Sequence, residues 1–152
     1  LEKPSHVLAK LLEAGSKGET FTVTGVDYST RDGTGIRDYI HVWDLARAHV
    51  NAVTDFDKVF ERAANPREDY LVINLGTGRG VTVRELVTAF EKVYGQKINK
   101  RETGPRPGDV AGSYTNADKA YRLLHWKAEL TIEDGISDAL KWGGIRESIL
   151  KY

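Results

Sequence analysis

The sequence predicts a mixed α/β fold in which short strands alternate with helices. Apolar residues recur at helical spacing in several stretches, and short runs of β-branched and aromatic residues lie between them. Clusters of glycine and proline separate the two kinds of stretch. A chain of 152 residues, of which 40% are hydrophobic, can bury one modest core, so residues 1–152 are expected to form one domain.

Composition excludes several classes of function. The 22 basic residues balance the 22 acidic ones, so no overall field directs the chain toward nucleic acid or an anionic membrane. The absence of cysteine excludes disulfides and thiolate metal sites. No uncharged apolar run approaches the roughly 18 residues of a membrane span, and no leader pattern is present. We therefore expect a soluble, cytoplasmic domain.

The first elements are a helix and a short strand. The helix is predicted from Ser5, its N-cap, to Lys17, with Gly15 and Gly18 near its end. The alternation of size and polarity in Phe21–Thr24 predicts a strand before a turn at Gly25.

A second strand and helix are predicted after a polar loop. Gly33 and Gly35 allow this loop a positive φ and a close approach of the backbone to a bound group. Tyr39–Val42 is predicted to be the strand, and Asp44 the N-cap of the helix that follows. The predicted apolar face of that helix comprises Leu45, Ala46, His49, Val50 and Val53.

The second half of the chain continues the alternation. Leu71–Leu75 is predicted to be a buried strand after a connecting loop at 65–69. Thr82 and Glu85 form a capping-box pattern that begins a helix, and Gly95 marks its end. The remaining predictions are a strand at Ile98–Glu102, a proline-stiffened loop at 104–109, and helices at Ala117–Leu124, anchored by Trp126, and from Thr131 to Trp142.

One glycine-rich segment imitates a dinucleotide-binding loop. Gly76, Gly78 and Gly80 lie between a predicted strand and a predicted helix. The dinucleotide pattern G-x-G-x-x-G has a third glycine where this chain has Val81, whose branched side chain would separate helix from strand. A structural turn is therefore favoured over a cofactor loop.

Bond-making chemistry is not visible in the sequence. His41, Asp44 and His49 span a strand–helix junction without completing a metal-ligand set, so packing and capping roles are favoured. None of the seven tyrosines is followed four positions later by lysine, and no serine lies in a G-x-S-x-G elbow.

Binding chemistry concentrates in two irregular loops. Arg37 and Arg106 each lie near glycines, and a guanidinium can donate two parallel hydrogen bonds to the oxygens of a diphosphate. Asp109 can accept hydrogen bonds from a ribose diol. The alternative for each arginine is a structural ion pair, with Asp38 or Asp32 for Arg37 and with Asp109 for Arg106.

Two motifs carry a resemblance to a known family. The string D-Y-x-T-x-D-G-T-x-x-R-D-Y-I-H-V-x-D-L-A-x-A-H covers residues 27–49, and P-R-x-G-D covers 105–109. Together they resemble the carboxyl-terminal part of UDP-glucose 4-epimerases, which belong to the extended short-chain dehydrogenase/reductase family. The similarity extends from the first predicted helix to the region of Trp142.

The resemblance implies a role for each candidate residue. Arg37 and Arg106 match two arginines that bind the UDP diphosphate, and Asp109 matches the ribose-binding aspartate. Phe21, Thr22 and Thr24 match the strand that borders the uracil, although the family often has a large apolar residue at the position of Thr24. His6 and Val7 match residues near the diphosphate. For His6 the alternative is a solvated first-turn residue.

Ser113 matches a position that separates substrates within the family. A large tyrosine there resembles enzymes restricted to plain hexoses, and a small residue resembles those that also accept N-acetylhexosamines. The resemblance thus implies an enzyme that interconverts UDP-glucose and UDP-galactose and also the N-acetylhexosamine pair.

The resemblance also implies that the cofactor site and the catalytic residues belong to a part of the enzyme other than residues 1–152. An amino-terminal Rossmann half binds NAD and supplies the tyrosine and lysine that move a proton, so the chain alone is expected to be inactive. Without that half an apolar patch would be exposed, and the chain could pair with a second copy. The alternatives are a stand-alone nucleotide-sugar-binding module, a structural or pairing protein, and part of a related NAD-dependent sugar-nucleotide dehydratase or decarboxylase.

Overall fold

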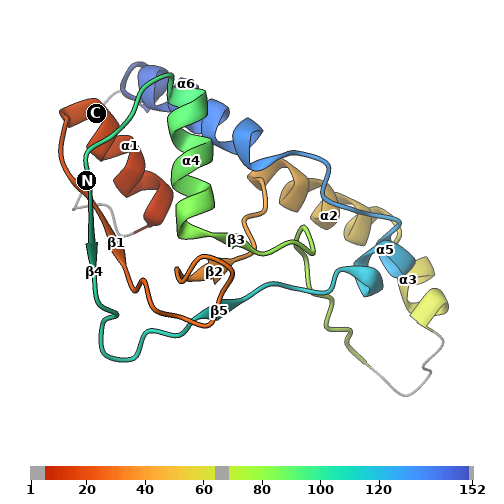
Figure 1. The fold of residues 1–152 in the computed structure, drawn as a ribbon. Coiled ribbons are helices and arrows are strands. Elements are labelled where there is room, and N and C mark those ends of the chain that lie inside the picture. Colours follow the sequence, from red (N-terminus) through yellow and green to blue (C-terminus); the bar gives the residue numbers. More distant parts are fainter. Residues whose placement is uncertain (1–5, 64–68, 151–152) are drawn as a thin grey trace. The chain divides into compact units, whose positions relative to one another are not determined.

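The computed structural model describes residues 6–63 and 69–150 (Figure 1). The chain divides into two compact units. The first unit comprises residues 1–36, 81–112 and 132–152, and the second unit comprises 37–80 and 113–131. The predicted N-cap Ser5 and most of the loop predicted at 65–69 lie outside the described residues.

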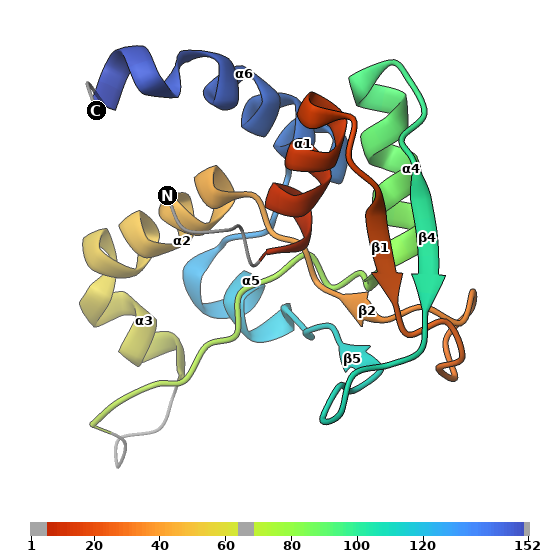
Figure 2. The same ribbon diagram turned by 90° about the vertical axis from the view of Figure 1, so that its left-hand side faces the viewer.

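The first unit contains three helices and a pair of parallel strands among its described residues. The helices are α1 (Val7–Lys17), α4 (Val83–Tyr94) and α6 (Ile132–Leu150). Strands β1 (Phe21–Thr24) and β4 (Lys100–Thr103) lie side by side, with Phe21 opposite Lys100 and Thr24 opposite Thr103 (Figure 2).

The core of the first unit joins its helices. Leu11 of α1, Leu86 and Phe90 of α4 and Ile136 of α6 are fully buried. The Tyr94 hydroxyl donates a hydrogen bond to the Gly15 carbonyl at 2.8 Å, which ties the end of α4 to α1. Any side chain at position 15 would press on Tyr94 and Phe90, so Gly15 fits where a larger residue would not.

Three very short strands form a second sheet. They are β2 (Ile36–Arg37), β3 (Val81–Thr82) and β5 (Gly112–Ser113), in the order β3-β2-β5. The Ile36 amide donates to the Ala111 carbonyl at 2.7 Å, and the Val83 amide donates to the Gly35 carbonyl at 3.0 Å. Few ladder bonds therefore hold these strands together.

The predicted limits of the first-unit elements are mostly confirmed. Gly18 ends α1 in the left-handed conformation, and β1 has the predicted bounds. His6 is the N-cap of α1 rather than a first-turn residue, and its side chain makes no capping hydrogen bond. The strand predicted at Ile98–Glu102 begins later, at Lys100, and the buried Ile98 lies before it.

The capping box of α4 is present as predicted. The Thr82 hydroxyl accepts from the Glu85 amide at 3.2 Å, and the Glu85 carboxylate accepts from the Thr82 amide at 2.9 Å. Gly95 ends the helix with a φ of 84°. The final helix, α6, extends to Leu150, beyond the predicted limit at Trp142.

The second unit is built from helices α2 (Val42–Thr54), α3 (Phe56–Ala63) and α5 (Asp118–Leu124). Trp126 anchors the end of α5 as predicted, because its Nε1 donates to the Asp44 carbonyl at 2.9 Å. The buried core residues of this unit are Ala48, Val59, Ala120, Leu123, Leu124 and Trp126.

The prediction of a strand at Tyr39–Val42 is wrong. The strand lies earlier, at β2, and Val42 is already the first residue of α2. The N-cap is His41, whose Nδ1 accepts from the Trp43 amide at 3.0 Å, and not Asp44. The β-branched Ile40 and Val42 resemble a strand in sequence, but the imidazole before the helix satisfies a free amide of its first turn.

The predicted inner face of α2 is also wrong. Val50 and Val53 are 59% and 77% exposed, whereas Asp44 and Ala48 are buried. Asp44 Oδ2 accepts from the Glu129 amide at 3.0 Å and from the Leu130 amide at 2.9 Å. A polar residue thus occupies the buried face because it satisfies backbone amides of another segment.

Leu71–Leu75 is not assigned as a strand. Leu71, Ile73 and Leu75 pack against the second-unit core, while Val72 is 65% exposed. The predicted alternation of burial is therefore present without the backbone pairing that defines a strand. None of the described helices is apolar over enough length to cross a membrane.

Candidate functional site

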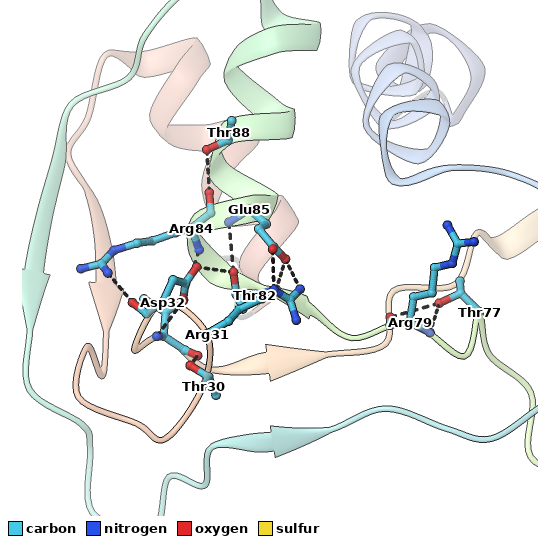
Figure 3. Close-up of polar contacts among 10 residues, drawn as sticks. Thr30, Arg31, Asp32, Thr77, Arg79, Thr82, Arg84, Glu85 and Thr88 are labelled. Carbon is cyan, nitrogen blue, oxygen red and sulfur yellow. Dashed lines mark hydrogen bonds and ion pairs between the residues drawn. The ribbon is translucent and has the colours of Figure 1, made fainter.

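The polar loop before β2 is attached to the start of α4 (Figure 3). The Asp32 carboxylate accepts from the Thr34 amide at 2.9 Å, from its hydroxyl at 2.7 Å and from the Thr82 hydroxyl at 2.5 Å. Arg31 pairs with Glu85, and Arg84 donates to the Asp32 carbonyl. The loop that leads to Arg37 is thereby fixed on the helix terminus.

Electrostatics favour the ionised form of this carboxylate. Burial raises the pKa of Asp32, but the hydrogen bonds from Thr82 and Thr34 and the charge of Arg84 together lower it below its usual value. Gly33 has a φ of 81°, and a Cβ there would lie 2.4 Å from the Val26 carbonyl oxygen. Gly33, the glycine of the D-G-T motif, is therefore needed to form the turn.

Arg106 and Asp109 lie together in an exposed turn of the first unit. Arg106 Nε is 3.2 Å from Asp109 Oδ2, and the Asp109 amide donates to the Arg106 carbonyl at 3.0 Å. The ion pair proposed as an alternative is thus present. The Arg106 side chain is 67% exposed. Pairs of this kind at the surface contribute only about 0–1 kcal/mol, so the Arg106 guanidinium can exchange its partner for a ligand at small cost.

The residues predicted to border uracil lie on β1. Phe21 is buried in the core and its amide donates to the Asn99 carbonyl at 2.9 Å, so neither its ring nor its amide is available to a base. Thr22 and Thr24 alternate with the buried positions, and the Thr22 hydroxyl accepts from Arg101 Nε at 2.9 Å. His6 and Val7 lie at the start of α1.

Arg37 and Ser113 are the last residues of the neighbouring strands β2 and β5. Both are exposed and both belong to the second unit. The structure therefore brings together a predicted phosphate-binding residue and the predicted specificity residue, although the two lie far apart in the sequence. Arg106 belongs to the first unit, so the meeting of the two arginines on one pyrophosphate stays a prediction.

Asp38, the residue after Arg37, holds the glycine-rich segment. Its Oδ1 accepts from the Thr77 amide at 2.9 Å and from the Thr77 hydroxyl at 2.5 Å. Its Oδ2 accepts from the Gly78 and Thr115 amides, each at 3.2 Å. The Thr77 hydroxyl also accepts from the Arg79 amide at 3.1 Å (Figure 3).

The glycine-rich segment does not fit the role of an NAD-binding loop. The amides of Thr77 and Gly78, which a cofactor phosphate would need, donate to Asp38. Gly76 is required for packing, because a Cβ there would lie 2.4 Å from Thr115 Cγ2 and 2.5 Å from Asp38 Oδ2. The prediction of a structural turn agrees with this geometry.

Sequence reasoning missed the role of Asp38. It considered this residue only as an ion-pair partner for Arg37, whereas the structure shows it bonded to two other segments. No local signal could have found it, because the close approach of Asp38 and Thr115 to Gly76 appears only in the structure.

The family model described as GDP-mannose 4,6 dehydratase matches residues 4–139. The chain belongs to this family. Among curated relatives, UDP-glucose 4-epimerase from Bifidobacterium longum subsp. longum is 48% identical over 120 residues, which are 79% of this chain and 33% of that enzyme.

Solved structures agree with this family assignment. A crystal structure of UDP-glucose 4-epimerase from Stenotrophomonas maltophila, with bound NAD and formylated UDP-arabinopyranose, has a TM-score of 0.85 and 35% identity, covering 98% of this chain and 42% of that one. The enzyme from Bifidobacterium longum, in complex with NAD⁺ and UDP, has a TM-score of 0.75 and 41% identity, covering 94% and 42%.

The chain spans about a third of the length of the curated relative and matches the carboxyl-terminal part of these epimerases. The resemblance to UDP-glucose 4-epimerases is therefore confirmed, as is the mixed α/β fold class. The roles of the individual site residues stay predictions.

Proposed function

We propose that the chain is the UDP-sugar-binding part of a UDP-glucose 4-epimerase, an NAD-dependent isomerase that interconverts UDP-glucose and UDP-galactose in galactose metabolism. The observation that carries this proposal is the 48% identity with a UDP-glucose 4-epimerase over 79% of the chain. We also propose that it acts in the cytoplasm.

The local geometry supports a binding role. Arg37 is exposed at the end of β2, after a loop that the hydrogen bonds of Asp32 attach to the start of α4. Arg106 is exposed in a turn closed by Asp109. A pyrophosphate offers adjacent anionic oxygens that suit the two donors of each fork. Binding energy from the unreacting nucleotide can then hold the reacting sugar in place.

We assign the catalytic steps of the proposed epimerase to an amino-terminal Rossmann half that binds NAD. The glycine-rich segment of this chain does not fit the cofactor, and no Y-x-x-x-K pair is present in its sequence. Several large apolar side chains of the second unit are exposed, four of them on α2, and they are the reason for proposing a partner surface there. They are Val42, Trp43, Val50, Val53, Phe56 and Val72. The amino-terminal half is the proposed partner, and a homodimer is the alternative.

A second candidate is a nucleotide-sugar 4,6-dehydratase. The description of the matching family model favours it. The residues of this chain would bind the nucleotide diphosphate in either enzyme, so only the reaction of the complete protein separates the two.

The test is a turnover assay of the complete protein and of the 152-residue chain. With NAD, the complete protein is expected to convert UDP-galactose to UDP-glucose, and the chain alone is expected to convert none. Turnover by the chain alone would contradict the assignment of catalysis to an amino-terminal half. Loss of water from the sugar by the complete protein would favour the dehydratase. Calorimetry with UDP on the chain separates a stand-alone binding module from a non-binding piece.

Ser113 gives a prediction about substrate range. Because this side chain is small and exposed at the end of β5, we expect the complete enzyme to accept UDP-N-acetylglucosamine as well as UDP-glucose. Ser113→Tyr should lower the ratio of kcat/KM for the N-acetylated substrate to that for the plain one by about tenfold or more, the size of a steric exclusion in a pocket. Ser113→Ala is the matched control and should leave the ratio unchanged. An unchanged ratio in Ser113→Tyr would refute this assignment.

A further inference from the structure

The carboxylate of Asp38 joins three segments of the second unit that are distant in sequence. It follows Arg37 at the end of β2, and it accepts hydrogen bonds from Thr77 and Gly78 in the glycine-rich segment. Its fourth hydrogen bond comes from the amide of Thr115. A single side chain thus links the phosphate-binding segment, the turn and the segment that contains Ser113.

The segments approach closely around this carboxylate. Gly76 is buried, and a Cβ at this position would collide with both Asp38 and Thr115. The turn therefore has no space in which to move while Asp38 and Thr115 keep their places. A packed, hydrogen-bonded arrangement of this kind has one geometry rather than a range of them.

The short strands alone hold Ser113 poorly. β2 and β5 contain two residues each, so their ladder supplies few hydrogen bonds. The bond from the Thr115 amide to Asp38 lies two residues beyond Ser113 and forms a second attachment for the same segment. Without it, residues 113–115 would be fixed on one side only.

We propose that Asp38 is a positioning residue that sets the place of Ser113 relative to Arg37, and through this the discrimination between plain and N-acetylated sugars. This inference rests on the proposed epimerase function. In this proposal Asp38 contacts neither the sugar nor the phosphate. It acts by fixing the positions of Arg37 and Ser113.

The test compares three variants of the complete enzyme. Asp38→Asn keeps the size of the side chain but turns an NH₂ group toward two of the N–H donors. Thr115→Pro removes the Thr115 N–H donor, and it also fixes the backbone φ there and replaces the threonine side chain. Thr77→Val, the matched control, removes the hydroxyl that bonds to Asp38 and leaves the Gly78 and Thr115 amides in place.

Asp38→Asn is expected to raise KM for UDP-glucose by about tenfold, because a displaced Arg37 would lose roughly one of its proposed charge-assisted hydrogen bonds to the pyrophosphate. It and Thr115→Pro should also change the ratio of kcat/KM for N-acetylated and plain substrates by about threefold or more. Thr77→Val should leave this ratio unchanged, even if its Tm falls as far as that of Asp38→Asn.

The outcomes separate the two proposals. A wild-type enzyme without epimerase activity would overturn the proposed function itself. An active wild type in which Asp38→Asn and Thr115→Pro lower Tm but keep the wild-type ratio would overturn only the positioning role. If Asp38→Asn does not fold, Thr115→Pro alone decides, because a changed ratio supports the proposal and an unchanged ratio overturns it.

Discussion

Replacing Arg37 by alanine is expected to weaken the binding of UDP to the complete protein about 100-fold. The guanidinium is proposed to donate two charge-assisted hydrogen bonds to the pyrophosphate, and their loss corresponds to about 2.7 kcal/mol. Arg37→Lys keeps the charge without the planar fork, so it should fall between wild type and alanine. Isothermal titration with UDP measures all three.

Two controls make this result specific. Arg79→Ala removes another exposed guanidinium from the second unit and should change the affinity for UDP little. Uridine has no phosphate, so its affinity should be the same in wild type and Arg37→Ala. Equal affinities of wild type and Arg37→Ala for UDP would favour the alternative, in which the arginine has a structural role and does not contact the nucleotide.

Replacing Asp44 by alanine is expected to lower the free energy of unfolding by about 3 kcal/mol. The carboxylate is fully buried, and its Oδ2 accepts from the Glu129 and Leu130 amides. Its Oδ1 forms an ion pair with Arg47 Nη2 at 3.2 Å, without a hydrogen bond among the described residues. Alanine leaves two amides without acceptors and a cavity beside the core.

Urea unfolding followed by tryptophan fluorescence measures this loss, because Trp126 is buried next to the backbone of Asp44. Asp57→Ala is the matched control: it removes an exposed carboxylate from the first turn of α3 and should change the free energy of unfolding by no more than about 0.5 kcal/mol. Equal losses in the two variants would show that the buried hydrogen bonds of Asp44 contribute nothing measurable.

The sequence predicted those elements whose signals are local. The capping box of Thr82 and Glu85, the glycine stops at Gly18 and Gly95 and the strand Phe21–Thr24 each depend on residues close in the chain, and each is present. Elements that depend on distant partners were less predictable. Leu71–Leu75 has the alternation of a strand but lacks its backbone pairing.

The region from Tyr39 to Asp44 shows how tertiary contacts override a local pattern. Its β-branched residues favoured a strand, but His41 caps a helix there. Asp44 was predicted to be the cap because aspartate is common at that position. Its actual partners, the Glu129 and Leu130 amides, lie more than 80 residues away, and no local rule reveals them.

The candidate site was predictable in part, and for a different reason. A guanidinium near glycines is a local signal, and motif resemblance supplied the pairing of Arg37 with Arg106. The placement of Ser113 next to Arg37 and the anchoring of both by Asp38 required the structure, because two-residue strands and a carboxylate shared by three segments leave no periodic pattern.

The central claim is that Arg37 and Arg106 bind one pyrophosphate. A crystal structure of the complete protein with UDP tests it through the distances from both guanidiniums to the pyrophosphate oxygens. We expect nitrogens of both side chains to lie about 2.7–2.9 Å from those oxygens, with the Arg106–Asp109 ion pair opened or shared. A bound UDP whose pyrophosphate contacts neither guanidinium, or only one of them, would contradict the account.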